Sequence, residues 1–75
     1  MTLVLYHQIA DGECAEVRRI IVERGLKPRI DFQNVATDAA EAFAAHGGQR
    51  VPALWYGRTF HQGRAAVLAA IDRVR

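Results

Sequence analysis

The sequence has few of the residues that stabilise small proteins in ways other than a hydrophobic core. Its 75 residues include one cysteine, so no disulfide can form within the chain. Only two prolines and no repeated or low-complexity segment interrupt it. Hydrophobic residues make up 51% of the chain, which is enough for one core. We therefore expect a single domain over residues 1–75.

Long runs of one residue class are also missing. No stretch approaches the roughly 18 apolar residues of a membrane helix, and none approaches the roughly five to eight clustered basic residues of a nucleic-acid patch. The 10 basic and 8 acidic residues are scattered and give a net charge of +2. No charged leader precedes an apolar run at the N-terminus, so we expect no signal peptide. The sequence thus predicts a cytoplasmic protein that binds neither membranes nor nucleic acids.

The apolar and turn patterns predict seven elements of secondary structure. Strands are expected at 2–7, 29–35, 51–56 and 59–61, and helices at 13–24, from 37 or 38 to about 46, and at 64–75. The order β-α-β-α-β-β-α favours the α/β class, with a four-stranded mixed sheet flanked by three helices. The first strand is a continuous apolar run, which places it at the centre of the sheet.

The spacing of several residues resembles that of the glutaredoxins over essentially the whole chain, without a gap. Tyr6 stands five residues before Asp11, and Cys14 stands eleven residues before Gly25. Arg50-Val51-Pro52 matches the family's Thr-Val-Pro segment. The chain also resembles the glutathione-binding N-terminal domain of the glutathione transferases. These resemblances imply a thioredoxin-like fold, a cis peptide bond before Pro52, and glutathione as a ligand.

The departures from that family concern the chemistry. Asp11-Gly12-Glu13-Cys14 occupies the Cys-x-x-Cys frame, so the family's nucleophilic thiol falls on Asp11, and a carboxylate cannot attack a disulfide. The thiolate that would hold an iron–sulfur cluster is missing as well, so no cofactor is expected. Gln8 and Gln62 replace two residues that contact glutathione in the family. We therefore expect redox activity to be impaired, or limited to Cys14.

Each candidate residue has a structural and a functional interpretation. Asp11 is a favoured helix N-cap, and it could also contact a ligand. Cys14 could be a small buried residue or a lone reactive thiol, because the helix dipole and the neighbouring acids act on it in opposite directions. Arg50 and Arg64 could flank a bound carboxylate or be solvated. The histidines at 7, 46 and 61 have no metal-ligand spacing, so no metal site is expected.

Two functions follow. The first is a glutaredoxin-related thiol–disulfide oxidoreductase linked to glutathione, with Cys14 as a weak catalytic candidate. The second is a non-catalytic binding module that holds glutathione, an extended or thiol-containing peptide, or another small anion at the Val51-Pro52 edge. Its expected ligand-binding residues are Asp11, Gly12, Glu13, Arg50, Val51, Pro52, Gly63 and Arg64. A detached transferase-like domain is a third possibility, but no helical domain follows it in this sequence.

Overall fold

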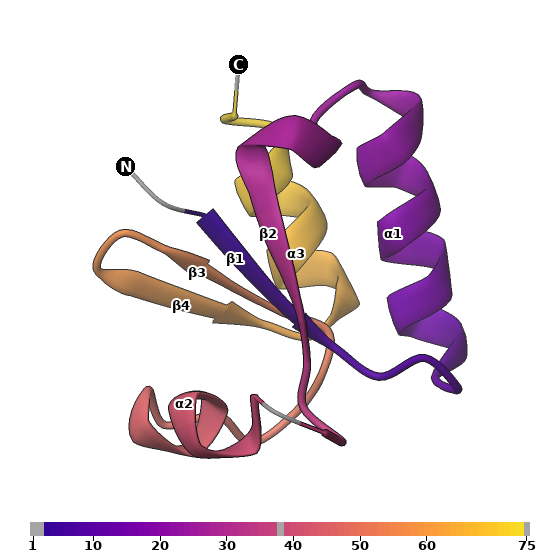
Figure 1. Ribbon diagram of the computed structural model, residues 1–75. Coiled ribbons are helices and arrows are strands. Elements are labelled where there is room, and N and C mark those ends of the chain that lie inside the picture. Colours follow the sequence, from indigo (N-terminus) through magenta and orange to yellow (C-terminus); the bar gives the residue numbers. More distant parts are fainter. Residues whose placement is uncertain (1–2, 38, 75) are drawn as a thin grey trace.

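The computed structural model describes residues 3–37 and 39–74. Its elements confirm the predicted order of strands and helices and add a short 3₁₀-helix, η1, before the second strand (Figure 1). They are β1 (Leu3–His7), α1 (Gly12–Glu23), η1 (Lys27–Arg29), β2 (Ile30–Asn34), α2 (Ala40–Ala45), β3 (Ala53–Tyr56), β4 (Thr59–Gln62) and α3 (Arg64–Ile71).

The four strands form one mixed sheet in the order β2-β1-β3-β4. β1 runs parallel to β2 and antiparallel to β3, and β3 forms an antiparallel hairpin with β4. In this register Leu5 lies between Phe32 of β2 and Leu54 of β3. The central position predicted for the first strand is therefore correct, and the protein belongs to the mixed α/β class.

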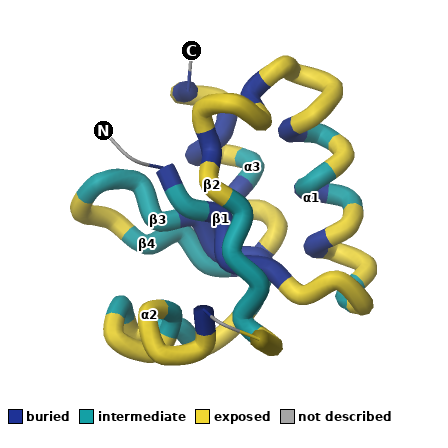
Figure 2. Tube along the Cα trace, in the orientation of Figure 1, coloured by how far each residue is buried: buried dark blue, intermediate teal, exposed yellow. Residues whose placement is uncertain are grey.

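The two faces of the sheet carry separate apolar clusters, because successive side chains of a strand point to opposite faces. α1 and α3 cover one face, where β1 and the two helices supply most of the fully buried residues (Figures 1 and 2). α2 covers one end of the other face. The larger cluster contains Leu3, Leu5, Val17, Ile21, Leu26, Ile30, Leu54, Val67, Ala70, Ile71 and Val74. The smaller one centres on Tyr6, Ala39 and Ala53, with Phe43, Trp55 and Phe60 against them.

Both ends of α1 follow from its sequence. Asp11 has the extended backbone of an N-cap, and its carboxylate accepts the Cys14 N–H. At the other end Gly25 has φ +69°, a conformation open to glycine, and the Leu26 N–H donates to the Ile21 carbonyl. This pairing is a Schellman motif, in which Leu26 also packs into the core. The predicted stop at Gly25 is confirmed.

The start of α2 differs from the prediction. Thr37 does not cap the helix: its hydroxyl donates to the Asn34 carbonyl instead. The same carbonyl accepts the Ala39 N–H, and the Asn34 side chain accepts the Ala36 N–H. Since these bonds tie Ala36, Thr37 and Ala39 to Asn34, the helix starts only after Ala39, which offers no side-chain cap. The predicted capping role of Asp38 lies outside the described residues.

Three further elements were predicted too wide. β2 spans Ile30–Asn34 rather than residues 29–35. β3 begins at Ala53 rather than at residue 51, because the segment before it leads into the strand as a bend. α3 ends at Ile71, and a turn follows in which the Val74 N–H donates to the Ile71 carbonyl. Val74 still reaches the core, as its apolar position in the pattern indicated. Arg75, the predicted end of this helix, is outside the described residues.

Candidate functional site

Asp11 closes the first turn of α1. Its carboxylate accepts the Cys14 N–H at 2.9 Å. Hydrogen bonds from the Cys14 thiol and amide hold the pKa of the Asp11 carboxyl below its usual range. The predicted N-cap role is confirmed, whereas a ligand-binding role for Asp11 stays a prediction.

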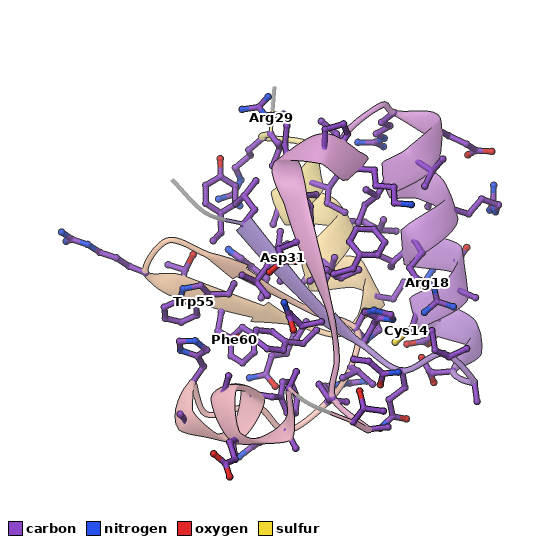
Figure 3. All side chains as sticks on the ribbon, viewed as in Figure 1. Cys14, Arg18, Arg29, Asp31, Trp55 and Phe60 are labelled. Carbon is purple, nitrogen blue, oxygen red and sulfur yellow. The ribbon has the colours of Figure 1, made fainter. Side chains whose placement is uncertain are left out.

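Cys14 is fully buried under the loop that joins β1 to α1. Figure 3 shows its sulfur on the side of α1 that faces the sheet, and the Gln8 N–H lies 3.5 Å from Sγ. Burial raises the pKa of the thiol to about 11, and the bonded Asp11 carboxylate adds to this, while the Gln8 N–H acts in the opposite direction. The thiol is therefore protonated at neutral pH and shielded from reagents. Of the two interpretations of Cys14, the structure supports the buried residue.

A hollow of about 440 Å³ lies between the first turn of α1, the segment before β3 and the start of α3. Four predicted ligand-binding residues line it, namely Glu13, Arg50, Gly63 and Arg64. The other predicted residues, Asp11, Gly12, Val51 and Pro52, do not line it. The structure therefore brings together about half of the predicted site.

Pro52 nevertheless helps to shape the hollow. The predicted cis peptide bond between Val51 and Pro52 is confirmed. The Pro52 carbonyl accepts the Gly63 N–H at 2.8 Å, which fixes the start of α3 against the segment before β3. Gly63 has φ +90°, and a Cβ there would lie 3.4 Å from Arg50 Nε. Glycine thus allows the Arg50 side chain to lie close to the backbone.

The first turn of α3 carries no side-chain cap. Gly63 is the N-cap residue, and the first intrahelical donor is the Val67 N–H, which bonds to the Gly63 carbonyl. The helix therefore does not use the amides of residues 64–66, and all three residues line the hollow. Amides at the start of a helix, together with its dipole, favour a bound anion.

The two arginines of the hollow differ in their partners. Arg64 forms a bidentate ion pair with Glu16 of α1. Its Nε donates to Oε1, and its Nη2 donates to Oε2 at 2.9 Å. This pair lowers the pKa of the Glu16 carboxyl and raises that of Arg64. Arg50 has no ion-pair partner among residues 3–37 and 39–74. Arg50 is therefore the cation available to a ligand, whereas the Arg64 charge is already compensated.

Gln62, one of the two residues that depart from the glutathione contacts implied by the resemblance, has a structural role. Its Oε1 accepts the N–H groups of Gln49 at 2.7 Å and of Arg50 at 3.2 Å. Its Nε2 donates to the Gly47 carbonyl at 3.4 Å. The side chain thereby fixes the loop that presents Arg50. No sequence pattern predicts these hydrogen bonds of Gln62, because they depend on the β3–β4 pairing.

Sequence reasoning also overlooked the role of Arg18, one turn beyond Cys14 on α1. Arg18 Nη1 lies 3.0 Å from His7 Nδ1 and donates to the Gln8 carbonyl at 3.1 Å, and Nη2 donates to the Ile9 carbonyl at 3.3 Å. The pKa of His7 is lowered mainly by burial and further by the nearby Arg18 charge. The imidazole is therefore held neutral, with Nδ1 as acceptor. The i, i+4 spacing of Cys14 and Arg18 could have placed both beside this loop.

The described residues contain neither a membrane-spanning helix nor a metal-binding cluster. None of their helices is long and apolar enough to cross a membrane. They also contain no group of three or more His, Cys, Asp and Glu side chains placed to hold a metal ion. Comparison of the chain with models of protein families, with curated proteins and with solved structures gave no match.

Proposed function

We propose that this chain is a glutaredoxin-related, thioredoxin-like protein that works in the cytoplasm as a binding module and has little or no thiol–disulfide activity. One observation carries the proposal: Arg50 and the uncapped first turn of α3 line the same hollow, while the single thiol of the chain is buried outside it. The site is thus equipped to hold an anion and is not equipped to exchange disulfides.

The charges around the hollow favour a ligand that carries a positively and a negatively charged group at the same end. A carboxylate can accept hydrogen bonds from the Arg50 guanidinium and from the amides of residues 64–66. Glu13 of α1 also lines the hollow, where its carboxylate would attract an ammonium group. A free α-amino acid end, such as the glutamyl end of glutathione, carries both groups. The volume of about 440 Å³ lies within the range of roughly 300–1,000 Å³ that is usual for small-molecule sites.

Calorimetric titration with reduced glutathione tests this assignment. Arg50→Gln should weaken binding by at least about tenfold, because a charge-assisted hydrogen bond contributes about 1.5–3 kcal/mol. Arg58→Gln, the same change on an exposed arginine of the β3–β4 turn, is the control and should leave affinity within about twofold. Glutathione acetylated on its amino group should also bind more weakly, and Glu13→Gln should remove that difference. Equal affinity of the Arg50 and Arg58 variants would contradict the site.

A separate assay tests the absence of redox catalysis. We expect no glutathione-dependent disulfide reduction above that of the Cys14→Ser variant. S-methylglutathione should bind as well as glutathione, since no thiol of the ligand is needed. Turnover comparable to that of a dithiol glutaredoxin, abolished by Cys14→Ser, would overturn the non-catalytic assignment and favour the oxidoreductase.

A further inference from the structure

A second hollow, of about 570 Å³, lies between α1 and β2, apart from the proposed glutathione site. Three apolar side chains line it: Ile9 of the β1–α1 loop, Val22 of α1 and Phe32 of β2. Ile9 is 65% exposed and Val22 is 54% exposed, although both side chains are large and aliphatic. Apolar surface gathered in a hollow is typical of ligand sites.

The rim of this hollow is cationic. Arg18, Arg19 and Lys27 border it, against a single carboxylate, Glu23. Glu23 pairs with Arg19 at 3.2 Å. Lys27 has no ion-pair partner in the described part of the chain, and the hydrogen bonds of Arg18 go to uncharged acceptors. Arg18 and Lys27 therefore form no ion pair within the described part of the chain.

The Arg18 guanidinium is fixed in position and can still donate to an anion. Its three hydrogen bonds, to His7 Nδ1 and to the carbonyls of Gln8 and Ile9, fix the guanidinium against the β1–α1 loop. They use three of its five N–H groups, so two donors, Nε–H among them, have no partner among residues 3–37 and 39–74. Because the protein has already ordered this side chain, a ligand does not have to immobilise it. Figure 3 shows Arg18 on α1 next to Cys14.

We propose that this hollow binds a small carboxylic acid with an apolar body. The apolar part would pack on Val22, Ile9 and Phe32, and the carboxylate would accept from Arg18 and lie near Lys27. A second copy of the chain is disfavoured as occupant, since a two-fold interface would place this cationic rim against itself. The volume of about 570 Å³ also suits a small molecule.

An NMR titration with 4-phenylbutyrate, with 4-phenylbutan-1-ol as its uncharged counterpart, tests the proposal. The acid should give saturable shifts at the amides of Ile9, Val22 and Phe32 and at the Arg18 Nε–H. The alcohol should bind at least about tenfold more weakly, because it lacks the charge-assisted hydrogen bonds. Equal binding of acid and alcohol, or shifts confined to other regions, would overturn the proposal. Saturation by an acidic apolar peptide but not by 4-phenylbutyrate would overturn it too, in favour of a protein partner.

Two exposed basic residues of η1 provide a matched pair of variants. Lys27→Glu reverses a charge on the rim and should weaken 4-phenylbutyrate by about three- to tenfold. Arg29→Glu makes the same change in net charge on a residue that does not line the hollow, and it should leave affinity within about twofold. Both residues are exposed, so both variants should fold. The same loss in both would show an effect of net charge alone and would contradict the site. The result is independent of glutathione binding, which involves neither residue.

Discussion

The reactivity of Cys14 gives a quantitative prediction. Burial in the fold raises the pKa of the thiol from 9.0 to about 11. Since only the thiolate attacks a disulfide reagent, a rise of two pKa units lowers the reactive fraction at pH 7.4 about a hundredfold. Burial also blocks approach of the reagent, because the side chain has no exposed surface. Native protein should therefore react with a disulfide reagent at least about a hundredfold more slowly than denatured protein.

The assay follows absorbance after mixing with an aromatic disulfide, in buffer and in denaturant. A Cys14→Ser, Ala15→Cys variant is the control, because Ala15 is exposed on the same first turn and its thiol should react rapidly. Asp11→Asn keeps an N-cap side chain but removes the charge that adds to the effect of burial on the thiol pKa, so it should speed the reaction severalfold. If native Cys14 reacts within about tenfold of the denatured rate while circular dichroism shows a folded chain, the reasoning from burial is refuted.

Two predictions concern stability. Gly48→Ala should destabilise the fold by about 1–3 kcal/mol in urea denaturation, because a Cβ there would lie 2.5 Å from the Phe43 ring; Gly12→Ala, with nothing within 4 Å, should be neutral or slightly stabilising, and an equal loss in both would contradict the packing argument. The fold lowers the pKa of His7 from 6.5, so below pH 6.5 the unfolded chain takes up a proton more readily and stability declines. His7→Gln should remove this part of the pH dependence, and an unchanged profile in that variant would count against it.

Local signals made much of the fold predictable. The apolar run of β1 predicted a central strand, and Gly25 predicted the end of α1, because both depend on short-range chemistry. The start of α2 was not predictable in the same way. There Asn34 ties the preceding turn together through its side chain and carbonyl, and propensity rules do not anticipate such competition for hydrogen bonds.

The candidate site was predictable only where the chain path decides it. Gly63 and Arg50 could be placed by spacing, and the structure brings them into contact range. Pairing across the fold could not be foreseen. Glu16 compensates Arg64 from 48 residues away, and Gln62 holds the loop of Arg50. Such long-range partners decide which charges a ligand meets, and single-sequence patterns do not contain them.

The most direct test of the account is an amide NMR titration of the Cys14→Ser variant with reduced glutathione. We predict saturable shifts at residues 64–66 and at Arg50, with the same affinity as the unmodified chain. This result would show that the start of α3 holds the ligand and that the thiol takes no part. Shifts absent from residues 64–66, or binding lost with Cys14, would contradict the account.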